Sequence, residues 1–224
     1  SKLNDKVEDI DLNLEDFVQK VNADLVGKTI NIASRSAGFI HKLFDGKLTE
    51  QLNPDQQQLL DQCISAGDDI GHCYENRQYQ QATRKIMALA DLANQYVDQQ
   101  KPWVMDKQPE QHPKVQQACS LALNLFRQLM VYLQPIVPGL AERSAGFLNC
   151  SLDWQQRKQA LTDHQINPFK PLLKRLDLTE VNQLIDHGDA WANHWFPLKK
   201  LMRSCLKPNA AFASIMAVDP MLKP

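Results

Sequence analysis

The chain has 224 residues, with 25 Lys plus Arg against 26 Asp plus Glu, so its formal net charge is -1. Apolar residues make up 43% and charged residues 23%, an ordinary globular composition that excludes wholesale disorder. No run of about 18 apolar residues is present, so we expect no membrane partner. The near-neutral charge also argues against a general nucleic-acid coat, and no DNA partner is expected.

Cysteine usage and the N-terminus indicate a cytoplasmic protein. The number of cysteines, five, is odd, and no two of them form a Cys-x-x-Cys motif. No secretory signal is visible at the N-terminus, so we expect reduced and mostly buried thiols. Cys63, His72 and Cys73 lack the spacing of a structural zinc site, so no metal ligands are assigned. The chain does not begin with Met, which favours a piece of a longer protein.

The first part of the chain predicts two helices. Apolar residues recur at three-to-four spacing over about residues 14–45, so one long helix is expected there. Asn13 should cap its start, and Asp45 with Gly46 should end it. Asn53 and Pro54 predict the start of a second helix, with an Asn cap and Pro at the first helical position.

The middle of the chain predicts two further helices with a loop between them. After a break near residues 75–76, a third amphipathic helix runs to Pro102, because the residue before a proline disfavours helical angles. Residues 100–112 are expected to form a polar loop that carries Trp103. Pro113 starts a fourth helix.

The last part of the chain predicts shorter elements. We expect a fifth helix over about residues 138–149, an irregular segment over 150–175, and a sixth helix that Thr179 caps and that stops near Gly188. The alternation that strands need is nearly absent. The sequence therefore predicts an all-α bundle of about five to six helices.

No catalytic signature is present, and no catalytic residue is assigned. The chain contains no glycine-rich phosphate loop, no nucleophile elbow and no His-Glu-x-x-His motif. Acid pairs such as Asp68 with Asp69 are typical of solvated helix faces. The histidines are dispersed, without spaced partners.

Asn31 and Arg35 form the first candidate binding pair. They stand four residues apart and so share one helix face, beside the small residues Ser34 and Gly38 that allow close approach to the backbone. An amide with a guanidinium can read the edges of bases. On spacing alone, an ordinary pair of surface residues remains the more common alternative.

Trp103 is the second candidate. A Trp that follows a helix-ending Pro102 either packs into the core or is held out as a platform. Unpaired bases stack on such platforms. Because Trp is highly buried on average, the residue alone favours the core alternative.

Several stretches, in the same order along the chain, resemble bacterial methionyl-tRNA synthetases, which are class I enzymes. The resemblance covers about residues 3–187 and points to the helical anticodon-binding domain that follows the catalytic domain in that family. It is carried by residues 10–26, 31–40, 86–94, 102–103, 124–127 and 167–170.

The resemblance implies roles for particular residues in binding the anticodon CAU of methionine tRNA. By analogy with the family, Asn31 and Arg35 contact the first anticodon base, Trp103 stacks on it, and Pro102 shapes the loop. Asp98 and Asp91 fall where family acids help to reject wrong anticodons. Among these binding positions the sequence departs from the family at Gly27, which stands where a further Asn is expected.

The resemblance also implies what belongs to another part of the enzyme. The family's ATP-binding motifs and its zinc insertion lie in the catalytic domain, and neither is found in this sequence. We therefore expect no cofactor in this chain. It would support the ATP-dependent attachment of methionine to tRNA by a catalytic domain that normally lies in the same chain.

The C-terminal segment departs from the resemblance, so we expect residues 1–189 to form the bundle and residues 190–224 an extension. A frame-shifted or vector-derived tail and a helical extension are both consistent with its sequence. A second hypothesis for the whole chain is a family-derived bundle that binds another protein, with Trp191 and Trp195 as anchors.

Overall fold

The structure is a computed structural model that describes residues 13–186. The predicted extension over residues 190–224, with Trp191 and Trp195 in it, lies outside these residues. Residues 13–186 contain no strand and form an all-α bundle, as predicted. The nearest feature to a sheet is an isolated antiparallel bridge between Lys47 and Gln165.

The predicted long first helix is confirmed as one helical rod with three parts. These are α1 (Leu14–Lys20), the π-helical segment η1 (Val21–Ile30) and α2 (Asn31–Phe44). The side chain of Asn13 accepts a hydrogen bond from the N–H of Asp16 at 3.1 Å and so caps α1, as expected. At the other end Gly46 adopts φ 82°, where a Cβ would lie 2.6 Å from a side-chain nitrogen of Gln165.

Three long helices complete the bundle, and the predicted starts of two of them are confirmed. Helix α3 (Pro54–Glu75) begins with a capping box made by Asn53 and Gln56. Helix α4 is Tyr79–Gln100 and α6 is His112–Leu133, with Pro113 in its first turn. Two shorter helices follow, α7 (Pro138–Leu148) and α8 (Leu178–Asp186).

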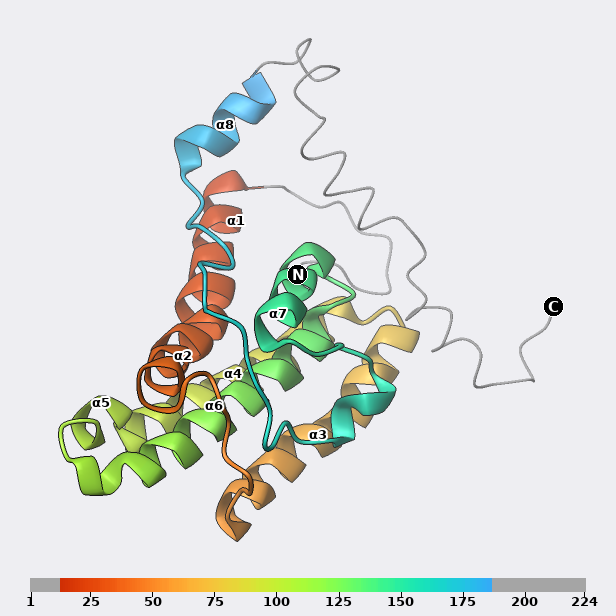
Figure 1. Cartoon of the computed structure of the whole chain (residues 1–224). Helices are drawn as coiled ribbons and strands as arrows, with labels where there is room; N and C mark the ends of the chain where they lie inside the picture. Colours follow the sequence, from red (N-terminus) through yellow and green to blue (C-terminus); the bar gives the residue numbers. More distant parts are fainter. Residues whose placement is uncertain (1–12, 187–224) are drawn as a thin grey trace.

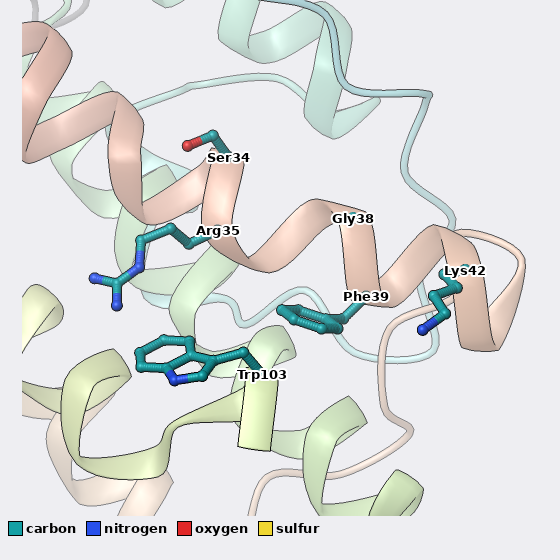
Figure 2. Close-up of a pocket in the computed structure, with 6 residues that line it drawn as sticks. All are labelled: Ser34, Arg35, Gly38, Phe39, Lys42 and Trp103. Carbon is teal, nitrogen blue, oxygen red and sulfur yellow. The ribbon is translucent and has the colours of Figure 1, made fainter. Parts of the chain in front are cut away.

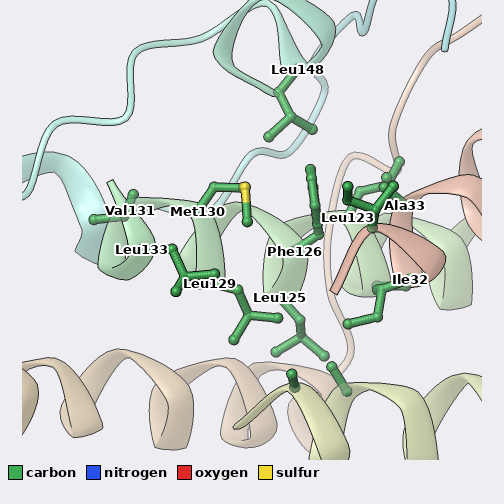
Figure 3. Packing of buried hydrophobic residues seen from close by; sticks show 14 of the residues in the cluster. Ile32, Ala33, Leu123, Leu125, Phe126, Leu129, Met130, Val131, Leu133 and Leu148 are labelled. Carbon is green, nitrogen blue, oxygen red and sulfur yellow. The ribbon is translucent and has the colours of Figure 1, made fainter. Parts of the chain in front are cut away.

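Helix α6 lies at the centre of the bundle, with α2, α3, α4 and α7 packed around it, whereas α8 packs against α1 (Figure 1). Every residue from Ala118 to Leu133 is buried, which is typical of a helix enclosed on all sides. Leu125 and Leu129 point to one side of α6, whereas Phe126 and Met130 point to the other, toward Leu148 of α7 (Figure 3). This two-sided core fixes α6 against both layers of helices.

Polar residues of α6 hold the segment over residues 150–175, which lacks regular structure apart from the short 3₁₀ turn Gln155–Lys158. The buried Asn124 both donates to the C=O and accepts from the N–H of Leu161, at 3.0 and 2.7 Å. The buried Arg127 donates to the C=O groups of Gln156 and Gln159. Side chains thus satisfy backbone groups that a helix or sheet would otherwise pair.

Two local predictions were wrong. Residues 100–112 are not simply a polar loop, because they contain the short helix α5 (Pro102–Met105) and the 3₁₀ turn η2 (Pro109–Gln111). Thr179 is not the cap of the last helix but lies inside α8. The carboxylate of Asp177 accepts a hydrogen bond from the N–H of Thr179 at 2.7 Å and so serves this helix end.

Candidate nucleic-acid interface

An open hollow of about 600 Å³ lies between α2 and α5. Figure 2 shows the side chains along it: Arg35 and Phe39 extend from α2 toward Trp103 of α5, and Lys42 lies farther along α2. Gly38 contributes open space, since a Cβ there would meet nothing within 4 Å. The residues that line the hollow are Ser34, Arg35, Gly38, Phe39, Lys42 and Trp103.

Arg35 and Trp103 contact each other directly. The guanidinium carbon of Arg35 lies 4.5 Å from the centre of the indole ring, within the range of a cation–π interaction. The same guanidinium donates to a carboxylate oxygen of Asp98 at 2.6 Å. Arg35 is therefore held between the ring and the acid, and it keeps further N–H donors for a ligand because a guanidinium carries five.

The backbone around α5 explains why the Trp103 ring faces solvent. Helix α4 ends at Gln100, and Lys101, which follows it, adopts a left-handed conformation with φ 49° and turns the chain back. Pro102 then starts α5 and is buried, so it anchors the turn. The next residue, Trp103, is left 37% exposed, which contradicts the core alternative and agrees with a platform.

The remaining residues predicted for the site lie farther from the hollow. Asn31 is the first residue of α2, one turn before Arg35, and is half-buried. It does not line the hollow. Asp91 lies on α4 two turns before Asp98 and pairs with Lys28 at 2.7 Å. The structure thus brings Arg35, Trp103 and Asp98 together. Of the residues predicted for the site, only Arg35 and Trp103 line the hollow.

A row of ion pairs joins the first helical rod to its neighbours. Arg35 with Asp98 is the middle pair, and Lys28 with Asp91 lies on one side of it. On the other side Lys42 pairs with Asp106 at 2.7 Å. The three cations are spaced by seven residues and so share one helix face.

Sequence reasoning missed Phe39, Lys42 and Asp106. The seven-residue spacing of Lys28, Arg35 and Lys42 was a signal that could have found Lys42, because residues seven apart on a helix lie on one face. Asp106 had no comparable signal, since its partner is 64 residues away.

Residues 13–186 hold neither a metal site nor a membrane-spanning helix. No group of three or more His, Cys, Asp and Glu side chains there could hold a metal ion. No helix in the same range is long and apolar enough to cross a bilayer. The cysteines described, Cys63, Cys73, Cys119 and Cys150, are free, and the first three are buried.

Comparison with known proteins identifies the family. Residues 48–168 match the model of the anticodon binding domain of methionyl tRNA ligase. This span contains Asp91, Asp98, Pro102 and Trp103, whereas Arg35 precedes it. The fold is that of an all-α anticodon-binding bundle. The chain belongs to the methionyl tRNA ligase anticodon-binding family, as the sequence resemblance implied.

Solved structures of methionyl-tRNA synthetase from Mycobacterium tuberculosis share the fold. The complex with methionyl-adenylate has a TM-score of 0.64 at 20% identity, over 72% of this chain and 33% of that one. The apo form has a TM-score of 0.66 at 20% identity, over 74% of this chain and 35% of that one. This chain therefore spans about a third of the length of those synthetases.

Proposed function

We propose that this chain binds the anticodon loop of methionine tRNA and selects the sequence CAU. The observation that carries the proposal is the Arg35 guanidinium over the exposed Trp103 ring at the edge of an open hollow. Sequence-specific RNA recognition targets unstacked loop bases, which proteins stack on aromatic rings and bind along their edges. An anticodon presents such bases.

Each site residue has a role in this proposal. Trp103 stacks on the first anticodon base, and Arg35 binds the edge of that base, with Asn31 one turn away as a further hydrogen-bonding group. Pro102 fixes the turn that presents the ring. Asp98 repels misplaced loops and binds Arg35 when no RNA is present, and Asp91 adds negative charge farther along α4.

The activity of the whole protein is part of the same proposal. Binding of the anticodon would support the ATP-dependent joining of methionine to its tRNA in the cytoplasm. A catalytic domain outside this chain would bind the ATP and, where present, the zinc. The residues proposed here act only in choosing the tRNA.

The test is a titration of the chain with labelled RNA hairpins at fixed low salt. One hairpin carries CAU in its loop, and the other differs in the first of these bases. We expect tighter binding of the CAU hairpin. Trp103→Ala should lose about 1–3 kcal/mol of binding free energy, the usual contribution of stacking on one base.

Val104→Ala is the matched control. Val104 follows Trp103 in α5, is 46% exposed and does not line the hollow. This variant should bind as the parent does. Equal binding of the two hairpins by the parent chain would refute the proposal. Loss of helical circular dichroism in Trp103→Ala would show instead that the ring supports the core.

A further inference from the structure

Helix α5, which presents Trp103, has only four residues and packs against α6. Two cations of α2, Arg35 and Lys42, contact this segment. At its start the Trp103 ring lies under Arg35. Just past its end Asp106 accepts a hydrogen bond from the ammonium group of Lys42 at 2.7 Å. A single helical turn is not stable by itself, so contacts such as these must hold it in place.

The two partners in the second contact are buried to different degrees. The side chain of Asp106 is only 16% exposed, whereas that of Lys42 is 63% exposed. The second carboxylate oxygen of Asp106, Oδ1, is buried and has no hydrogen-bond partner among the described residues. Lys42 is therefore the cation that compensates a largely desolvated carboxylate.

Because Lys42 lines the hollow, its position alone suggests a phosphate ligand (Figure 2). The ion pair argues against that role. A phosphate that drew Lys42 away would leave the largely buried Asp106 carboxylate without a cation, and removal of one partner of such a pair is costly. The adjacent carboxylate would also repel the phosphate.

We propose that Lys42 is a positioning residue, which fixes α5 against α2 through Asp106 and thereby sets the position of the Trp103 ring. Lys42 does not bind RNA phosphate. As far as it concerns RNA, this inference rests on the proposed function. It assigns to Lys42 and Asp106, at the far end of α5, the task of holding the platform that the RNA contacts.

Asp106→Asn gives the sharpest test, because the two roles of Lys42 predict effects of opposite sign. A positioning role predicts weaker binding of the CAU hairpin, since the ion pair is lost while every positive charge remains. A phosphate-binding role predicts equal or tighter binding, since a negative charge beside the ligand is removed. Unchanged or tighter binding by Asp106→Asn would overturn the proposal.

Lys42→Met in a double-mutant cycle with Trp103→Ala is the second test. If Lys42 acts through the ring, its removal weakens binding by less than the roughly 5- to 150-fold expected for Trp103→Ala and has no further effect once the ring is absent. The dependence of affinity on salt should also keep its slope. A persistent effect in the Trp103→Ala background, or a slope lower by about 0.7, would identify a phosphate contact instead. Lys42→Arg should restore binding.

A measurement without RNA separates this proposal from the proposed function. The chain is labelled with fluorotryptophan, and the ¹⁹F resonance of Trp103 is assigned from its absence in Trp103→Phe. Lys42→Met and Asp106→Asn should shift or broaden this resonance, whereas Lys114→Met, which removes an exposed charge from the first turn of α6, should not. An unmoved Trp103 resonance in both ion-pair variants contradicts the positioning role, whatever the chain binds.

Discussion

Arg35 has two partners in the free chain, and the proposed RNA ligand would replace both. It lies over the Trp103 ring and binds Asp98, whose side chain is 60% exposed. An ion pair this exposed contributes little to stability, so exchanging it for a ligand costs little. Asp98 therefore suits a role in selecting among ligands better than a role in holding the fold.

Asp98→Asn should weaken the discrimination between RNA loops. We expect the variant to bind the CAU hairpin as well as the parent does, or slightly better, and to gain more affinity for the altered hairpin. The expected loss of discrimination is modest, about 1 kcal/mol or less, in line with exposed charge pairs. The ratio of the two dissociation constants measures it.

Asp91→Asn is the companion to this variant. Asp91 binds Lys28, which does not line the hollow, whereas Asp98 binds Arg35, which does, so removal of the Asp91 charge should change the ratio less. If Asp98→Asn leaves the ratio of dissociation constants unchanged, Asp98 takes no part in selection.

At the scale of elements, helix starts could be predicted from the sequence because their signals are local. Asn13 and Asn53 cap the helices that they were expected to cap. The π-helical hydrogen bonding of η1 could not be predicted, because apolar residues at three-to-four spacing describe a buried face and not the hydrogen-bonding partner of each N–H. The short α5 was missed because Pro102 both ends one helix and starts the next.

The candidate site could be predicted only in part, for a similar reason. The amide–guanidinium pair and the Trp after the proline were visible as residue types, and the resemblance suggested that they act together. That Arg35 contacts Trp103, and that Asp106 needs Lys42, depends on segments more than 60 residues apart. Local spacing carries no information on such contacts.

Two helical glycines make a matched test of the element packing. Gly67 of α3 is buried, and a Cβ there would lie 2.8 Å from both Arg157 Nε and the Tyr132 hydroxyl oxygen. Gly38 of α2 has open space at the same position. Gly38→Ala should therefore raise the free energy of unfolding by about 0.5–1 kcal/mol, the usual gain of Ala over Gly in a helix.

Gly67→Ala should lower the free energy of unfolding by about 1–3 kcal/mol, because overpacking against a fully buried Tyr132 outweighs the gain in helix propensity. Urea unfolding followed by circular dichroism measures both variants. Stabilisation by Gly67→Ala would mean that α3 is farther from Tyr132 than the structure has it.

At the scale of the whole molecule, burial in the core raises the pKa values of several thiol and phenol groups. Burial raises the pKa of the Cys63 thiol from 9.0 to about 11, and burial is also the largest cause that raises the pKa of Cys119 to about 12. Burial likewise raises the pKa of Tyr96 from 10.0 to about 12. The folded chain thus retains protons that the unfolded chain releases.

The sign of the resulting pH dependence follows from linkage. Below about pH 9 both states keep the thiol protons, and the full stability is present. Between about pH 9 and 11 only the unfolded chain loses the Cys63 proton, so stability falls as pH rises. Under reducing conditions, the urea midpoint should be lower at pH 10 than at pH 8.

Cys63→Ala is the control for this effect. It lowers stability at both pH values by leaving a small cavity, but it should show a smaller drop between them, because one of the titrating groups is gone. A urea midpoint of the parent that stays constant or rises between pH 8 and 10 would contradict the assignment of these groups to the core.

The central claim is that the ring of Trp103 stacks on the first base of the CAU anticodon, and a cycle between protein and RNA tests it most directly. The parent chain and Trp103→Ala are each titrated with the CAU hairpin and with a hairpin that lacks only that first base. We predict that the parent loses about 1–3 kcal/mol of binding free energy when the base is removed, and that Trp103→Ala loses much less. Equal losses for the two proteins would show that this base binds elsewhere and would contradict the account.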